Sequence, residues 1–298
     1  MTTGTRSPRW ARISGWSTRP SARAGTRPQA ELQKTKAAAA PVRSQETDNG
    51  QLRLRRPARG DPLGRGRGPR PQREVLVRND TPALDPARTV VFTGIGTSLH
   101  AARVAADWVT QMTGRMGLAL AVDAHDLGSG ALPLTGAEQV VVISHRGYKI
   151  YPTASLERAR AAGCTTIAVV GLAAPEQAAD HVMRTCANET AGTFSVSYLA
   201  SLAALARLVA PFDRDGAFSA ALPSLPEALA QTLARPLERK VAEDIAVATP
   251  ILITGFAGDL VTAQEAALKI KEGTWLWTEA MSRLNSPSTA PLLPTSPA

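Results

Sequence analysis

The chain has 298 residues, 44% of them hydrophobic and 20% charged, which is enough to bury one large or two medium α/β cores. Its formal net charge of +9 suggests a nucleic-acid partner until the charge is divided along the chain. Residues 1–75 contain 17 Lys and Arg against 5 Asp and Glu, which leaves 17 against 20, or −3, for residues 76–298. We therefore do not expect the folded part to bind nucleic acid.

The N-terminal segment, residues 1–75, is rich in Arg, Pro, Gly, Ser and Thr and follows no period of 2 or 3.6, so we expect it to be disordered. Its Arg-rich stretch at 52–70 is compatible with an RNA- or DNA-binding arm. The alternative, which we favour because no aromatic stacking pattern accompanies the arginines, is a translated upstream or frame-shifted stretch of GC-rich DNA.

No apolar run of about 18 residues occurs, so we expect no transmembrane helix. The Arg-rich N-terminus also lacks the apolar core of a secretory signal. Cys164 and Cys186 lie on apolar segments and are expected to be buried thiols in a reducing compartment. These features make a cytoplasmic protein the default expectation.

The first folded element is expected at residues 89–95. Its apolar run VVF, at 90–92, shows no polar alternation and is typical of a strand covered on both faces of a parallel sheet. Gly94 and Gly96 allow the backbone to turn sharply into an amphipathic helix that ends near Gly114. The free amides at the start of such a helix favour an anion, so a phosphate or polyol site is expected here.

Strand and helix patterns then alternate, which predicts a doubly wound α/β layer around a parallel sheet. Further strands are expected at 118–122, 138–144, 164–171 and 181–188, and further helices at 152–162 and 197–208. These elements form a first domain over 88–212. A connector follows at 213–248, in which we expect a long helix reaching Val247.

A second unit of the same kind is expected at 249–281, with a strand at 250–256 and a helix at 260–273. Four prolines follow within residues 282–298, so this last segment is expected to be disordered and the second domain to be incomplete. Five apolar positions of this unit then need cover, which predicts a homodimer, or aggregation if the truncation is real. They are Ile251, Ile253, Val261, Leu268 and Ile270.

Three stretches carry a family resemblance: TGIGTSLHAA at 93–102, VVISHRGYKIYPTASLERARAAG at 141–163, and GFAGDLVTAQEAALKIKEGTWLWTEAM at 255–281. With them the chain resembles the sugar isomerase (SIS) domain family, most closely the isomerase half of glutamine:fructose-6-phosphate amidotransferases. The resemblance implies a flavodoxin-like fold with two SIS domains, the second incomplete. It also implies a hexose phosphate of the fructose-6-phosphate or glucosamine-6-phosphate class, and neither a metal nor a cofactor.

Carried over position by position, the resemblance implies that Glu272 is the general base that moves a proton between C1 and C2, and that Lys269 is a supporting cation. Thr97 and Ser98 would contact the sugar, and Ser144 the phosphate. The full set of implied substrate-binding residues is Gly96, Thr97, Ser98, Ser144, His145, Arg146, Lys149, Ser195 and Ser197.

The phosphate loop departs from the family, which has neutral hydroxyl and amide side chains there. In this chain Arg146 and Lys149 would hold an anion by charge, and His145 is interpreted as a residue at the rim of the ligand site. No His occurs after His181, so the ring-opening His of the family has no counterpart. Residue 2 is Thr2 rather than a nucleophilic Cys, and no glutaminase domain is expected.

Two function classes remain open. The first is an aldose–ketose isomerase or isomerising transaminase, and the second is a phosphosugar-binding module without turnover. We expect binding with little turnover. Other interpretations are that Ser98 only caps a helix, that Lys269 and Glu272 form an ordinary surface ion pair, and that His100 is a packed helix residue. A dinucleotide site is disfavoured because Leu99 stands where a third glycine belongs.

Overall fold

A computed structural model of the chain describes residues 70–77, 81–187, 189, 192–236, 238–248 and 250–282, which all lie in one compact unit, Leu54–Ala298. The predictions of disorder for residues 1–69 and 283–298 fall outside the described residues. Within the described ranges, no helix combines the length and the apolar character needed to cross a bilayer.

Five parallel strands form the main sheet in the order β2-β1-β3-β4-β5. Their bounds are β1 Val90–Gly94, β2 Ala119–Asp123, β3 Gln139–Ile143, β4 Thr165–Val170 and β5 His181–Arg184. The strand order reverses between the neighbours β1 and β3, because β2 lies on one side of β1 and the later strands on the other. This doubly wound sheet confirms the predicted fold class.

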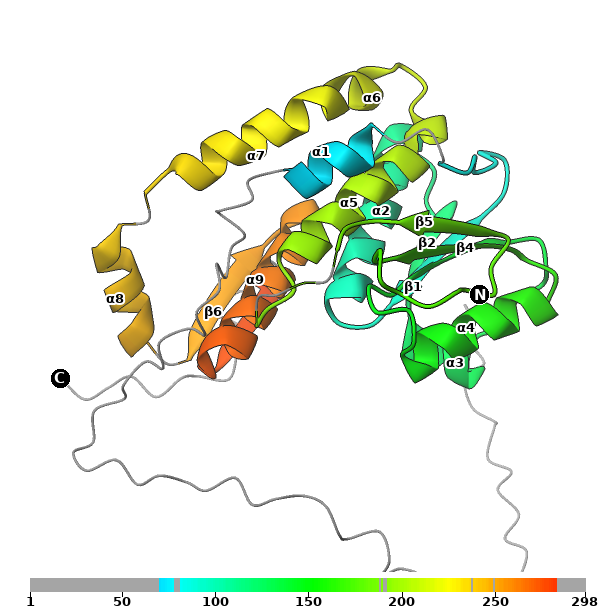
Figure 1. The fold of residues 1–298 in the computed structure, drawn as a ribbon. Helices are drawn as coiled ribbons and strands as arrows, with labels where there is room; N and C mark the ends of the chain where they lie inside the picture. The colour runs from blue at the N-terminus through cyan, green and yellow to red at the C-terminus, as the bar shows by residue number, and fades with distance from the viewer. Residues whose placement is uncertain are drawn as a thin grey trace, which may run out of the picture. The chain divides into compact units, whose positions relative to one another are not determined.

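Helices cover both faces of the sheet (Figure 1). One face packs against α1 Arg70–Leu76, α2 Thr97–Thr113 and α5 Val196–Leu208, and the other against α3 Ala124–Ser129 and α4 Ile150–Ala161. Side chains alternate between the two layers, since Val90 and Phe92 join the first core cluster and Val91 joins the second. Both faces of β1 are therefore buried, as its unbroken apolar run predicts.

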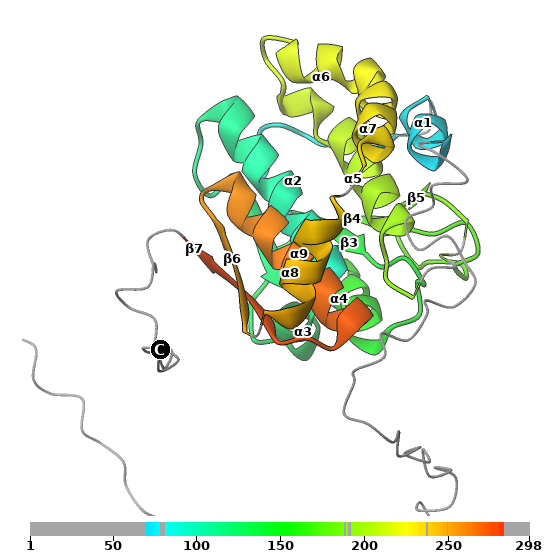
Figure 2. The ribbon, with the colours of Figure 1, turned by 90° about the vertical axis from the view of Figure 1, so that its left-hand side faces the viewer.

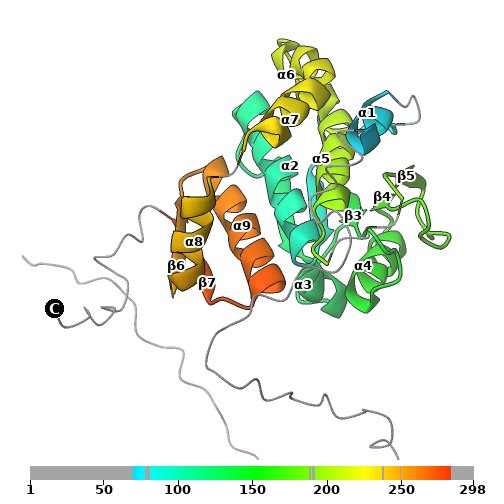
Figure 3. The same ribbon diagram turned by 60° about the vertical axis from the view of Figure 1, so that its left-hand side comes forward.

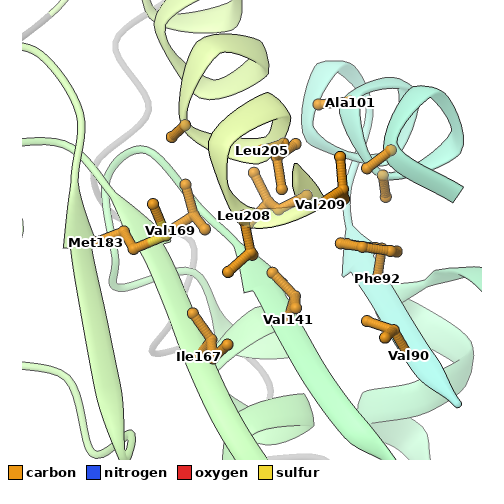
Figure 4. Packing of buried hydrophobic residues seen from close by; sticks show 14 of the residues in the cluster. Val90, Phe92, Ala101, Val141, Ile167, Val169, Met183, Leu205, Leu208 and Val209 are labelled. Carbon is orange, nitrogen blue, oxygen red and sulfur yellow. The ribbon is translucent and has the colours of Figure 1, made fainter. Parts of the chain in front are cut away.

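The larger core lies between the sheet and α5, where Leu205 and Leu208 face Val141 and Ile167 (Figure 4). Phe92, with no exposed surface, fills the space between β1 and α2. The cysteines, Cys164 and Cys186, are buried free thiols, as expected. Burial and a nearby glutamate raise the pKa of Cys186 to about 11, so this thiol is uncharged at neutral pH.

Helix α1 contradicts the prediction that disorder extends to residue 75. Val75 is only 2% exposed, and its carbonyl accepts a hydrogen bond from Arg207 Nη1 at 2.8 Å. Gln72 Nε2 donates to the carbonyl of Val196 at 3.4 Å. A seven-residue helix is stable only through such tertiary contacts, which composition does not reveal.

The connector does not contain the single long helix that we expected. It is divided into α6 Ala217–Ala221, the 3₁₀ turn η2 Leu222–Ser224, α7 Leu225–Ala234 and α8 Arg239–Val247, after the 3₁₀ turn η1 Ala210–Phe212. Pro223 and Pro226 stand near the starts of η2 and α7, and Pro236 separates α7 from α8. Proline is tolerated in a first helical turn but interrupts a helix interior, which accounts for the breaks.

The last unit consists of β6 Ile251–Gly255, α9 Gly258–Thr274 and β7 Thr278–Ser282. Strand β7 pairs in parallel with β6 and was not predicted. It includes Ser282, which contradicts the prediction that disorder begins at residue 282. The five apolar positions of this unit are half-buried, so the homodimer stays a prediction. Helix α9 lies alongside α2 in both Figure 2 and Figure 3.

Replacing Phe92 with Ala should lower the free energy of unfolding by about 3–5 kcal/mol, because it removes a fully buried ring and leaves a cavity. Leu120→Ala is the matched control, since Leu120 lies on the neighbouring β2 and is 45% exposed. Urea denaturation measures both. Similar losses for the two variants would contradict the packing described above.

Candidate functional site

A cavity of about 260 Å³ lies at the carboxyl ends of β1 and β3, where the strand order reverses. Open α/β sheets bind ligands at this position. Of the eleven predicted site residues, those that line the cavity are Gly96, Thr97, Ser98, Ser144, His145, Arg146, Lys149, Ser197 and Glu272. A larger cavity, of about 610 Å³, lies between α1, α5 and the α6–α7 segment and contains none of the predicted residues.

The turn between β1 and α2 forms one wall, and two glycines shape it. Gly96 has φ 55° and ψ −123°, a conformation that residues with a Cβ rarely adopt. A Cβ on Gly94 would lie 2.6 Å from the Cβ of Ser98, so only glycine lets α2 begin directly beyond the strand. Gly96 is the helix cap and Ser98 is not, so the capping interpretation of Ser98 is wrong.

The loop between β3 and α4 forms the opposite wall. Ser144 is 6% exposed, and its Oγ has no hydrogen-bond partner in the described part of the chain. Backbone hydrogen bonds fix the loop, because the Ser144 amide donates to Val169 at 3.0 Å and the Gly147 amide to Ser144 at 2.9 Å. A buried hydroxyl costs free energy unless it is paired, so Ser144 marks a position for a polar ligand group.

Two helix N-termini, those of α2 and α4, face the cavity. The first turns of α2 and α4 contain no acidic residue, and no side chain caps either helix. Lys149, the N-cap residue of α4, is exposed, as is Arg146, whose guanidinium lies 5.3 Å from the ring centroid of Phe194. The amide dipoles and the two cations make this end of the cavity attractive to an anion.

His145 lies against Phe194, with 6.3 Å between the ring centroids. Both ring nitrogens are buried and lack a hydrogen-bond partner within the described residues. Burial lowers the pKa of His145 below its ordinary value of 6.5; the charge of Glu189 opposes this shift and that of Arg146 adds to it. The imidazole is therefore neutral at pH 7, and Arg146 and Lys149 supply the positive charge of this loop.

The N-terminus of α5 is compensated by an internal carboxylate. The amide and the Oγ of Ser197 both donate to Glu189 Oε2, at 2.9 and 3.2 Å. An anion is therefore repelled from the N-terminus of α5 and favoured beside that of α4. Ser195, which directly precedes α5, does not line the cavity.

Helix α9 closes the cavity with Leu268 and Glu272. Lys269 lies behind this wall, and its Nζ donates to Glu272 Oε2 at 2.7 Å and to Thr97 Oγ1 at 2.8 Å. The side chains of Lys269 and Glu272 are 20% and 38% exposed. Because Lys269 also reaches α2, the pair is not an ordinary surface ion pair.

Several residues at the site were not predicted. Phe194, Tyr198, Ser201 and Leu268 line the cavity, and Glu265 is buried behind it. Glu265 precedes Lys269 by four residues and Glu272 by seven, so helical periodicity could have placed all three on one face. Burial and the charge of Glu265 raise the pKa of Tyr198, which keeps its phenol protonated. The described residues contain no cluster of three or more His, Cys, Asp or Glu that could hold a metal ion.

Residues 83–210 match the SIS domain family, so this part of the chain is an SIS domain. The match spans all five strands of the main sheet and the first two walls of the cavity. It therefore confirms the family resemblance stated above for this region. No curated protein sequence matches the chain.

Solved structures share the fold at low sequence identity. The C-terminal domain of glucosamine-fructose-6-phosphate aminotransferase from Francisella tularensis has a TM-score of 0.62 and 16% identity, over 76% of this chain and 71% of its own. A Silicibacter pomeroyi protein described provisionally as a phosphosugar isomerase has a TM-score of 0.59 and 22% identity, over 74% of this chain and 66% of its own. Tagatose-6-phosphate ketose/aldose isomerase from Escherichia coli has a TM-score of 0.52 and 17% identity, over 76% of this chain and 68% of its own.

The lowered pKa of His145 predicts a pH-dependent stability. Because folding disfavours the imidazolium, the unfolded chain binds more protons, so stability is lost as the pH falls below the ordinary pKa of 6.5. Between about pH 7 and about pH 5, the free energy of unfolding should fall less in His145→Gln than in the unaltered chain. Urea denaturation at each pH measures this free energy. His181→Gln, at an exposed position on β5, is the control. An unchanged pH profile for His145→Gln would contradict the burial of this ring.

Proposed function

We propose that the cavity binds a hexose phosphate of the fructose-6-phosphate or glucosamine-6-phosphate class. The observation that carries the proposal is the buried, unpaired Oγ of Ser144 at the switch point of the sheet, next to Arg146 and Lys149. The SIS domain, and structural neighbours named for tagatose-6-phosphate and glucosamine-fructose-6-phosphate enzymes, support this class of ligand.

The charges of the site support one orientation of this ligand. A phosphate monoester carries close to two negative charges at neutral pH, and Arg146 and Lys149 supply two positive ones. Both cations adjoin the uncapped N-terminus of α4, whereas Glu189 occupies the N-terminus of α5. The phosphate therefore belongs beside Ser144 and α4, and the sugar extends toward α2 and α9.

The proposed reaction is an aldose–ketose isomerisation at the sugar end. Glu272 would remove a proton from the carbon beside the carbonyl and return it to the former carbonyl carbon, while the hydroxyl proton moves between the two oxygens. Glu272 lines the cavity, and Lys269 holds its carboxylate at 2.7 Å. In this proposal one carboxylate acts as both base and acid.

A phosphosugar-binding module without turnover is the second candidate. The side chain of Glu272 is 38% exposed and ion-paired, whereas carboxylates that transfer protons at neutral pH are commonly more desolvated. This observation favours binding over catalysis. The two candidates share the same ligand and differ only in whether a proton moves.

Arg146→Ala should weaken hexose phosphate binding by about 1.5–3 kcal/mol, roughly 10- to 150-fold, because it removes a charged hydrogen-bond donor to the phosphate. Calorimetry with fructose-6-phosphate, glucosamine-6-phosphate and neutral fructose measures the effect, and fructose should respond little. Arg115→Ala is the control, since Arg115 is exposed beyond the far end of α2. If Arg146→Ala bound hexose phosphate as tightly as the unaltered chain, Arg146 would not contact the phosphate and the proposed anion site would be wrong.

Glu272→Gln should keep hexose phosphate binding and abolish isomerisation, because an amide cannot carry the proton between carbons. Incorporation of deuterium from D₂O into the sugar, followed by NMR, detects even slow proton transfer. Glu243→Gln, at an exposed position on α8, is the control. If the unaltered chain exchanges deuterium and Glu272→Gln exchanges it equally, another residue is the base. If the unaltered chain shows no exchange, the protein binds the sugar phosphate without isomerising it.

A further inference from the structure

A buried polar cluster joins α2 to α9 beside the cavity, and Figure 2 and Figure 3 show these helices side by side. Its centre is Glu265, which is 7% exposed. His100 Nδ1 lies 2.6 Å from Glu265 Oε2, Thr97 Oγ1 donates to Glu265 Oε1 at 3.1 Å, and Lys269 Nζ lies 3.3 Å from the same oxygen. Three donor groups from two helices therefore surround one buried carboxylate.

Burying a carboxylate at this helix contact costs desolvation free energy. The other buried residues of α9, Ala263 and Ala267, are small and apolar, and such residues would pack the two helices without desolvating a charge. His100 and Glu265 have side-chain exposures of 12% and 9%, so solvent does little to lower the cost. The cluster is better explained by what it does to Thr97, its one member that lines the cavity.

The hydroxyl of Thr97 has a fixed direction in this cluster. A hydroxyl has one proton to donate and two lone pairs to accept with. Thr97 donates its proton to Glu265 and accepts from Lys269 at 2.8 Å. An ammonium can only donate and an ionised carboxylate only accepts, so neither bond can reverse. Thr97 keeps one free lone pair and therefore offers the cavity an acceptor and no donor.

We propose that His100 and Glu265 are positioning residues that orient the hydroxyl of Thr97, so that Thr97 recognises a hydroxyl of the ligand and rejects its phosphate. The proposal rests on the proposed function and adds to it the direction in which the ligand lies. Phosphate oxygens need donors, which Ser144, Arg146 and Lys149 provide on the opposite wall. A sugar hydroxyl can donate to the remaining lone pair of Thr97.

The test compares the affinity of the protein for glucosamine-6-phosphate with its affinity for inorganic phosphate. The affinity for phosphate is measured by its competition with glucosamine-6-phosphate. Thr97→Val removes the hydroxyl at nearly constant volume and should weaken glucosamine-6-phosphate about two- to tenfold, with phosphate changed by less than about twofold. Thr97→Ser should restore binding. His100→Leu should weaken glucosamine-6-phosphate binding as Thr97→Val does. His100→Asn keeps a donor toward Glu265, so its affinity for glucosamine-6-phosphate should be close to that of the unaltered chain.

Arg103→Met is the matched control, because Arg103 Nη1 donates to Gln264 at 2.8 Å and so joins α2 to α9 without touching Thr97. This variant should leave both affinities unchanged. Equal losses for glucosamine-6-phosphate and phosphate in Thr97→Val, or no loss of either, would overturn the orientation while the proposed function stands. If the unaltered chain binds neither compound, the proposed function fails and this proposal fails with it.

Discussion

The close packing of a helix against the end of its own strand is the constraint on which the cavity depends. At Gly94 no Cβ fits, and at Gly96 the backbone has a positive φ of 55°, which glycine adopts most readily. Together they place Thr97 at the carboxyl end of the sheet. The same turn recurs after β6, where Ala257 has φ 51° and ψ −128°, close to the values of Gly96. The helix of this second strand–turn–helix unit closes the cavity with Leu268 and Glu272.

The main sheet could be predicted because β-branched runs such as those of β3 and β4 bury both faces and carry their own signal. The parts that were missed or misplaced lack such a signal. Strand β7 has the sequence TEAMS, with little β propensity, and forms only because β6 offers it a partner edge. Helix α1 depends on α5, and the divided connector depends on where its prolines fall.

The cavity was predictable where one local motif places a residue at a strand end, as with Thr97 and Ser144. It was not predictable where helices distant in sequence meet. The contact between His100 and Glu265 spans 165 positions, and no local pattern distinguishes this histidine from a core residue. Lys269 and Glu272 were identified through the family resemblance, whereas the contact of Lys269 with Thr97 required the packing of α9 on α2.

One wall of the cavity comes from α9, which ends at Thr274, whereas the last strand of the main sheet ends at Arg184. The wall is therefore formed by residues that come much later in the chain than the sheet. During synthesis, the strands and their covering helices can therefore associate before the final wall has left the ribosome. At that stage Thr97 lacks both Glu265 and Lys269, and its hydroxyl is free to rotate. The sheet then presents a polar cleft that lacks one wall, and α9 brings the carboxylate and the ammonium that fix the direction of the Thr97 hydroxyl.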